Sequence, residues 1–320
     1  MADVFLDASP RKLKDSVVRF VEILFAHPFR TPSRHELGMF LAYGASLRSA
    51  SPGRQVGACV ASDGDCVAVG TNEVPKYGGG EYWEGDEGDW RDHQRPFDST
   101  TLLTDSLLAD LLGRLRAKQW LRADLAALDV QSLLDRTVSE ALLGKLQAAE
   151  GDPISLSERA LIRDIIEFMR AVHAEMAAIT SAARRGVSLK GCTMYVTAFP
   201  CHECAKHIVS SGIKEVFFVD PYPKSRASEM FDDSIVVDRE QPDRVPFLAF
   251  TGIAPRFYTE AFQMPERRDG NGWVRWEARR ATQLPRRWAS PNMYLEKEDE
   301  VLRRLSRKRL PMVVEERKAT

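Results

Sequence analysis

The chain has 320 residues, of which 44% are hydrophobic and 28% are charged, as is usual for a globular protein that buries a sizeable core. Its 45 Lys and Arg side chains are balanced by 46 Asp and Glu, which gives a formal net charge of -1. This balance argues against a protein that wraps nucleic acid without sequence preference, and it favours a small substrate.

The N-terminal region and the apolar runs indicate where the protein works. No run approaches the roughly 20 apolar residues that are needed to span a bilayer. Charged residues recur throughout the first 25 positions, whereas a secretory signal needs an uninterrupted apolar segment. We therefore expect no membrane partner and a cytoplasmic location.

Two helices are expected near the N-terminus. Residues 11–26 have apolar groups at helical spacing and are followed by Pro28. Residues 33–50 form the second helix, and Ser33 and Glu36 have the spacing of a capping box at its start. The apolar side chains of this second helix fall on one face, namely Leu37, Phe40, Leu41, Gly44 and Leu47.

A hairpin follows these helices. Two short apolar runs, 55–61 and 66–70, flank an Asp-Gly pair, which is typical of a tight turn between strands. Beyond it lies an irregular loop rich in Gly, aromatic and acidic residues, from 76 to 98. We expect Cys59, Cys66 and Cys192 to be small buried apolar groups within strands.

The rest of the chain alternates helices and strands. Leucine stripes between about 100 and 150 predict a helical insertion that packs on the main body. A second capping box, Ser155 with Glu158, opens a further helix, which runs to about Met169. Helices at 173–185 and 205–211 alternate with strands at 192–197 and 215–219, which predicts an α/β sheet covered by helices. A basic helical segment is expected at 296–309.

Two short motifs carry the chemistry. The first is His173-Ala-Glu175 at a helix start, and the second is Pro200-Cys201-His-Glu-Cys204, which follows a strand and opens a helix. One imidazole and two thiolates make three ligands, and a catalytic zinc ion needs three ligands and an open position for water. The two motifs together match the signature of zinc nucleobase deaminases. We therefore expect Zn²⁺ to be held by His173, Cys201 and Cys204.

Glu175 lies two residues beyond the expected histidine ligand. From there its carboxylate could reach a zinc-activated water without displacing it. The expected role of Glu175 is to carry protons from that water to the ring nitrogen and then to the departing amine.

Two other interpretations of the cysteine pair stay open. A Cys-x-x-Cys sequence can be a redox pair, although such a pair has no need of the His173 motif. A closed structural zinc site would require a fourth ligand, and His202 or His207 could serve.

The motifs resemble those of the deoxycytidylate deaminase family. The matching pieces are Arg48-Ser-Ala-Ser-Pro-Gly-Arg-Gln-Val-Gly-Ala58, Gly70-Thr-Asn72, His173-Ala-Glu175 and Pro200-Cys-His-Glu-Cys204. The resemblance implies a cytidine-deaminase-like fold, in which a mixed central sheet is flanked by helices, here with a large helical insertion. Further stretches at 72–76, 81–83, 221–225 and 252–258 look like those of bacterial anti-phage dCTP and dCMP deaminases. Such enzymes convert deoxycytidine nucleotides to deoxyuridine nucleotides and deplete the pool that a phage needs.

Substrate contacts follow from the same resemblance. Asn72 matches the family asparagine that contacts the sugar. Arg54 and Lys224 have the charge to bind phosphates, although either could be an ordinary surface charge. Tyr222 and Trp83 are candidates to stack on or flank the base, and core packing is the alternative for both.

One departure from the anti-phage group concerns regulation. Members often carry a P-loop domain before the deaminase, but the sequence has no G-x-x-x-x-G-K-[ST] motif. A separate regulatory partner chain is therefore one candidate replacement, and homo-oligomers are also expected. We predict a single deaminase domain with its core at about 33–75 and 171–240, an insertion at 76–165 and an extension at 241–320. The alternative function is deamination of cytosine in single-stranded DNA or RNA, which would require a basic groove with stacking aromatics.

Overall fold

The computed structural model describes residues 2–121, 168–239, 241–263, 265–270 and 272–276. The chain divides into two compact units, residues 32–256 and residues 1–31 with 257–320, which are described separately below. The predicted division into core, insertion and extension stays a prediction. The helix expected at 155–169 falls largely outside the described residues, and the basic segment at 296–309 lies wholly outside them.

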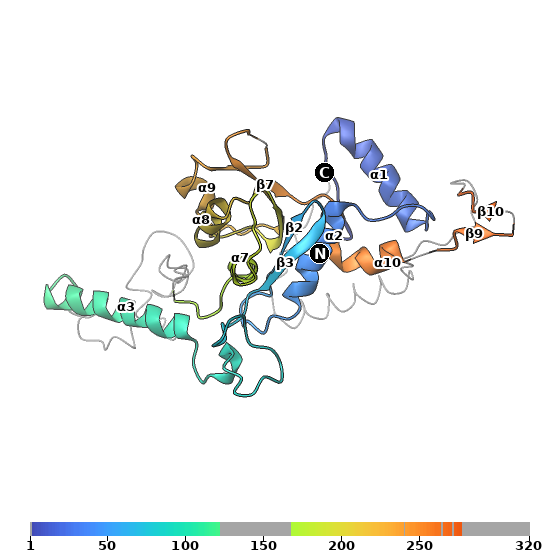
Figure 1. Cartoon of the computed structure of the whole chain (residues 1–320). Helices are drawn as coiled ribbons and strands as arrows, with labels where there is room; N and C mark the ends of the chain where they lie inside the picture. Colours follow the sequence, from blue (N-terminus) through green and yellow to red (C-terminus); the bar gives the residue numbers. More distant parts are fainter. Residues whose placement is uncertain (1, 122–167, 240, 264, 271, 277–320) are drawn as a thin grey trace, which may run out of the picture. The chain divides into compact units, whose positions relative to one another are not determined.

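The larger unit is built on a mixed six-stranded sheet with the strand order β3-β2-β4-β5-β7-β6. Strands β2, β3 and β7 of this sheet are labelled in Figure 1. The first two pairings, β3 with β2 and β2 with β4, are antiparallel, and the others are parallel. This is the mixed sheet flanked by helices that the sequence predicted. The strands are β2 Gly57–Ser62, β3 Asp65–Thr71, β4 Thr193–Ala198, β5 Glu215–Asp220, β6 Ile235–Val237 and β7 Val245–Ala249. The short strand β8 Gly252–Ile253 also belongs to this unit.

The predicted hairpin is confirmed as β2 and β3. Asp63 and Gly64 form its turn with φ values of 52° and 98°, and positive φ at both positions is the mark of the type I′ turn that fits twisted strands. Cys59 is buried as expected, but Cys66 is exposed. The expectation for Cys66 was wrong because β3 is an edge strand, and Cys66 lies at its turn end, where the sheet offers little cover.

Alternation along β2 and β4 gives the sheet two different faces. Ala58, Val60, Met194 and Val196 belong to the main core, which also includes the inner faces of helices α7 and α8. Tyr195 points to the opposite face, towards Gly38 of helix α2. The helices of this unit are α2 Arg34–Ser46, α3 Ser99–Ala117, α7 Ala174–Arg184, α8 His202–Ser210 and α9 Ala227–Met230, with a 3₁₀ turn at Asp92–Gln94.

Helix α2 begins at the predicted capping box. The Ser33 hydroxyl accepts a hydrogen bond from the Glu36 N–H, and the Glu36 carboxylate accepts one from the Ser33 N–H. The apolar stripe noted in the sequence is not the packed face, however, since Leu37 is 37% exposed and Leu47 is 58% exposed. The buried residues are Glu36, Gly38, Met39, Ala42 and Ser46. Three of these residues, Gly38, Ala42 and Ser46, are small and allow the helix to approach the sheet closely, since a Cβ atom at Gly38 would meet the Tyr195 ring.

The insertion departs from the expected packing. Asp98 caps α3 by accepting hydrogen bonds from the N–H groups of Thr100 and Thr101. Among the residues of α3, all of which the structure describes, only Thr104 is buried. Leu103, Leu107 and Leu111 of the predicted stripe are exposed. The stripe in α3 therefore does not provide the packing on the main body that the sequence predicted.

The smaller unit contains α1 Pro10–Leu24, α10 Tyr258–Phe262 and the short strands β1 Val4–Phe5, β9 Arg268–Asp269 and β10 Gly272–Trp273. A 3₁₀ turn at Pro255–Phe257 leads into α10. The helix predicted at 11–26 is thus confirmed. Within this unit the Arg267 side chain donates a hydrogen bond to the Pro28 carbonyl, at 2.8 Å. Among the described helices of the chain, none combines the length and apolar character that crossing a membrane requires.

Candidate active site

His173 is the N-cap residue of α7. The backbone just before it is held in place, because the Val172 N–H donates a hydrogen bond to the Glu73 carbonyl at 3.0 Å, next to the end of β3. The His173 ring does not cap its own helix, so it is available to turn towards α8.

Cys201 is the N-cap residue of α8, and its sulfur accepts a hydrogen bond from the Cys204 N–H at 3.4 Å. Free N–H groups and the helix dipole at such a position stabilise a thiolate. The helix starts at His202, three residues before the predicted start, because the cysteine side chain itself provides the cap.

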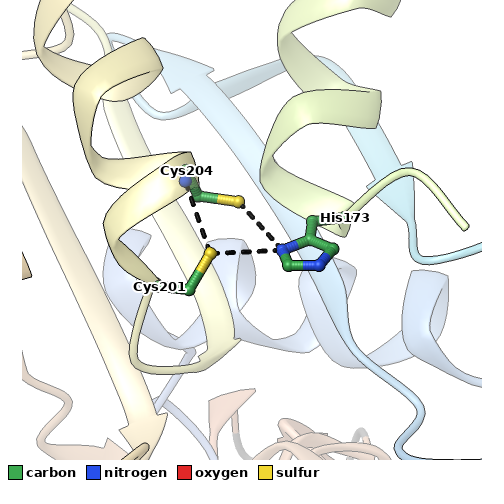
Figure 2. Close-up of side chains that lie close together, drawn as sticks. All are labelled: His173, Cys201 and Cys204. Carbon is green, nitrogen blue, oxygen red and sulfur yellow. Dashed lines mark hydrogen bonds between the residues drawn. The ribbon is translucent and has the colours of Figure 1, made fainter. Parts of the chain in front are cut away.

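The two helix starts bring the three predicted ligands together (Figure 2). The His173 Nδ1 atom lies 3.3 Å from each of the Cys201 and Cys204 Sγ atoms, and all three ligand atoms lie within 4.8 Å of one another. Around a tetrahedral zinc ion, a nitrogen and a sulfur ligand would be separated by about 3.5 Å. The donor set and its spacing therefore fit zinc bound through Nδ1.

No fourth protein ligand joins this group among the residues that the structure describes. His202 and His207, the candidates for a closed structural site, are both outside it. A metal held by three protein ligands keeps an open position, as catalytic zinc sites do.

The two cysteine ligands differ in acidity. Hydrogen bonding from Cys204 and from His173 lowers the pKa of the Cys201 thiol to about 4. The hydrogen bond that Cys204 donates to Cys201, together with burial, raises the pKa of Cys204. The hydrogen bond with Cys201 raises the pKa of His173. Cys201 is therefore the more acidic of the two thiols, and binding of a metal by both thiolates would release the proton of Cys204.

Glu175 lies in the first turn of α7 and is only 4% exposed. Burial raises the pKa of its carboxyl group, while nearby His173 acts in the opposite direction. A carboxyl group with a raised pKa beside a metal site is suited to exchanging protons near neutral pH.

The group opens into a cavity of about 330 Å³. His173, Glu175 and Cys201 form part of its wall. Ala174, Ala198 and Phe199 lie beside these residues in the wall. The rest of the wall comes from three places: residues 51–54, Val56 and Asn72 beside the hairpin, Asp92 and 98–100 with 169–171 around the insertion, and Tyr222 with Lys224 after β5. The loop after β5 is fixed near the metal ligands, because the Ser225 hydroxyl donates a hydrogen bond to the Pro200 carbonyl at 2.7 Å.

All four predicted substrate residues line this cavity: Asn72, Arg54, Lys224 and Tyr222. The Asn72 side chain also has a structural task, since it accepts from the Val56 N–H and donates to the Arg54 carbonyl, both at 2.7 Å. An Asn amide has two N–H donors and two lone pairs on its oxygen. These two hydrogen bonds use one of each, so one N–H and one lone pair remain for a ligand. Arg54 forms an ion pair with Asp220 at 3.3 Å.

Trp83 does not line the cavity. Its ring packs instead against the Arg48 guanidinium, whose Cζ atom lies 4.0 Å from the ring centre. Trp83 therefore makes a cation–π contact with Arg48.

Sequence reasoning missed the cavity residues from the insertion. Arg170 donates a hydrogen bond to the Asp92 carboxylate at 2.6 Å and others to the Trp90 carbonyl, which joins the segment before His173 to the acidic loop. Asp98, Ser99 and Thr100 lie at the start of α3. The position of Arg170, three residues before His173, could have suggested that it lies near the site. Nothing in the neighbouring sequence indicates that its partner is Asp92.

Comparisons with known proteins identify the family of this chain. The family model described as the cytidine and deoxycytidylate deaminase zinc-binding region matches residues 32–220. Deoxycytidylate deaminase of Enterobacteria phage T4 is 51% identical over 55 residues, which are 17% of this chain and 28% of that protein. The human deoxycytidylate deaminase is 52% identical over 54 residues, which are 17% of this chain and 29% of that protein. ComE operon protein 2 of Bacillus subtilis is 34% identical over 92 residues, and the match covers 25% of this chain and 49% of that protein.

These matches span less than a third of the two deoxycytidylate deaminases and about half of the Bacillus subtilis protein. Among solved structures, dCMP deaminase of the cyanophage S-TIM5 in complex with dCMP and dUMP is similar, with 16% identity and a TM-score of 0.36. That comparison covers 69% of this chain and 99% of the other.

Proposed function

Because the chain belongs to the cytidine and deoxycytidylate deaminase family, whose zinc-binding region matches residues 32–220, we propose that it deaminates deoxycytidine nucleotides. The substrate is dCMP, dCTP or both, and the products are the deoxyuridine nucleotide and ammonia. The observation that carries this proposal is the juxtaposition of His173, Cys201 and Cys204 with the buried Glu175 in the wall of one cavity.

Zinc is the cofactor of this family, and in this chain His173, Cys201 and Cys204 would hold it. When bound there, zinc supplies a Lewis acid that makes water a better nucleophile at neutral pH. The chain's own contribution to proton transfer is Glu175. Its carboxylate takes a proton from the attacking water and gives it to the ring nitrogen, and it then delivers a proton to the amine as ammonia departs.

The rest of the cavity holds the nucleotide. The free half of the Asn72 amide is available to a sugar hydroxyl, and Tyr222 is placed to pack on the base. Arg54 and Lys224 supply positive charge for phosphate. Arg54 must exchange its Asp220 partner, but that ion pair is about half exposed and worth at most about 1 kcal/mol. A phosphate that accepts two charge-assisted hydrogen bonds can therefore replace Asp220.

The activity is tested with the purified chain and three substrates: dCMP, dCTP and a cytosine-containing single-stranded oligonucleotide. Deoxyuridine products are separated by chromatography, and ammonia is measured in parallel. We expect turnover of one or both nucleotides. Turnover of the oligonucleotide alone would support the nucleic-acid alternative and overturn the proposal.

The cellular role that we propose is depletion of deoxycytidine nucleotides during phage infection. The resemblance to anti-phage deaminases supports this role. The same resemblance supports our further proposals of a cytoplasmic location, a homo-oligomer and a separate regulatory partner. In cells that express the chain, the dCTP pool should fall after phage infection, whereas cells with the Glu175→Gln variant should keep it. Equal pools in the two strains after infection would contradict the defensive role while leaving the chemistry intact.

A further inference from the structure

Two cysteines outside the metal group lie side by side on the hairpin. Cys59 of β2 and Cys66 of β3 have their Sγ atoms 3.4 Å apart. Cys66 pairs with Ala61 across the hairpin. Ala61 lies two residues after Cys59 on the same strand, so Cys59, Ala61 and Cys66 share one face of the sheet. A shift of register between Val60 and Ala61 accompanies this diagonal contact.

The two thiols differ sharply in access. Cys59 is 0% exposed, whereas Cys66 is open to solvent on the edge strand. All five cysteines lie in the described part of the chain, and Cys66 is the only exposed one. An oxidant from solvent therefore reacts first with Cys66. The thiol that is in contact with Cys66 and can react with its oxidised form is Cys59.

The contact also activates the exposed thiol. The hydrogen bond that Cys59 donates to Cys66 lowers the pKa of Cys66 to about 7, and the positive charge of Arg185 acts in the same direction. The same hydrogen bond and burial raise the pKa of Cys59. Cys66 is therefore the more acidic and the more accessible of the two thiols, and the thiolate is the form that reacts with peroxides and disulfides.

We propose that Cys66 and Cys59 form a peroxide-reactive dithiol, with Cys66 as the attacking thiol and Cys59 as the resolving thiol. The Cys66 sulfur attacks a hydroperoxide, an S–O bond forms, the O–O bond breaks, and the leaving oxygen departs as hydroxide or alkoxide. The Cys59 sulfur then attacks the resulting sulfenic acid. An S–S bond forms, the S–O bond breaks, and the Cys59 proton leaves with the hydroxyl group as water. A dithiol reductant reverses the oxidation.

The geometry permits this closure. A disulfide needs its sulfur atoms about 2.05 Å apart, so the pair must approach by a little over 1 Å. Cys66 lies one residue from the start of β3, beside the Asp63-Gly64 turn, where the strand can adjust more easily than at buried Cys59. The cavity residues Val56 and Asn72 flank the opposite end of the hairpin. The cross-link should therefore form without loss of metal from the site.

The test uses the full chain loaded with zinc and treated with equimolar hydrogen peroxide, then alkylated under denaturing conditions. Trypsin cuts after Arg54 and Lys76, so peptide 55–76 carries both thiols and no other cysteine. We expect that peptide to lose two hydrogens, to resist alkylation, and to recover both alkylation sites after dithiothreitol. Cleavage before Asp63 and Asp65 should then leave two fragments joined by the disulfide. Zinc content, measured on the same sample, should be unchanged.

Three variants separate the roles of the thiols. Cys59→Ser should leave a sulfenic acid at Cys66 that a dimedone reagent traps, whereas Cys66→Ser should leave Cys59 unoxidised. Cys192→Ser, which removes a buried thiol just before β4, should form the Cys59–Cys66 link like the parent. Full alkylation of both cysteines in peptide 55–76 after peroxide would overturn the proposal. So would a Cys201–Cys204 disulfide, with loss of zinc, that forms before the hairpin reacts.

Discussion

Gly70 of β3 lies directly against the carbonyl oxygen of Ala174, the first residue of α7. A Cβ atom at position 70 would be 2.1 Å from that oxygen and 2.3 Å from the Ala178 nitrogen. Both are backbone atoms, so the helix itself would have to move. Because α7 begins at the His173 N-cap and carries Glu175, the absence of a side chain at Gly70 sets the position of the metal site.

Gly70→Ala should therefore reduce both stability and metal affinity. We expect a loss of about 1–3 kcal/mol in the free energy of unfolding, as overpacked cores show, and weaker zinc retention during dialysis against a chelator. Gly44→Ala is the matched control, because Gly44 lies in α2 with no atom near the added methyl group. It should leave zinc retention unchanged, and it should leave stability equal or slightly higher. Equal behaviour of the two variants would show that the Gly70 contact does not position α7.

Glu175→Gln tests the proton carrier with little change in shape. The amide fills the same buried space but cannot accept and return a proton. We expect kcat to fall by about 10²–10⁴-fold, with zinc content equal to that of the parent. Steady-state kinetics on the nucleotide that the parent turns over, together with metal analysis, provide the measurement. Activity near the parent level would exclude Glu175 from the role assigned to it.

Lys224→Ala tests the phosphate side of the cavity. Losing one charged hydrogen bond to phosphate should raise KM by about tenfold or more and change kcat little. Arg226→Ala removes a positive charge two residues away that is paired with Glu229 at 2.9 Å and does not line the cavity. That control should keep the parent KM. A similar rise in KM for both variants would indicate a general charge effect rather than a phosphate contact at Lys224.

The acidic loop yields a pH prediction. Hydrogen bonds from the Arg91 side chain, at 2.7 Å and 2.9 Å, lower the pKa of Asp89 to about 2. An Asp with a depressed pKa in the folded state stabilises the fold above its unfolded pKa of about 3.9, and this stabilisation is lost as the pH falls towards 2. Asp89→Asn should thus cost about 1 kcal/mol at neutral pH.

Urea unfolding of Asp89→Asn and the parent at several pH values checks this expectation. The difference in unfolding free energy should stay constant from pH 7 to about 5 and shrink below about 4. A difference that is independent of pH down to 3 would mean that the Asp89 charge contributes no stability.

Local signals in the sequence were sufficient for much of the fold and for the metal group. The Ser33–Glu36 capping box, the Asp63-Gly64 turn and the two ligand motifs each depend on residues within a few positions of one another. Their geometry depends on local backbone conformation and hydrogen bonding, and each of these features is present in the structure.

Features that depend on distant contacts could not be predicted. The packed face of α2 includes the small residues Gly38, Ala42 and Ser46 and the charged residue Glu36, and hydrophobic periodicity does not mark these positions. Exposure of Cys66 depends on β3 being an edge strand. The pairing of Arg170 with Asp92 joins segments 78 positions apart. Strands β6 and β7 are short, and Pro246 lies within the second, so neither has the usual strand pattern.

The central claim is that one zinc ion is held by His173, Cys201 and Cys204. Metal analysis of the purified chain, by mass spectrometry with a protein concentration from amino-acid analysis, tests it most directly. We expect one zinc per chain in the parent and in Glu175→Gln, and almost none in Cys204→Ser or His173→Ala. A parent that binds no zinc, or a Cys204→Ser variant that keeps a full equivalent, would contradict the account.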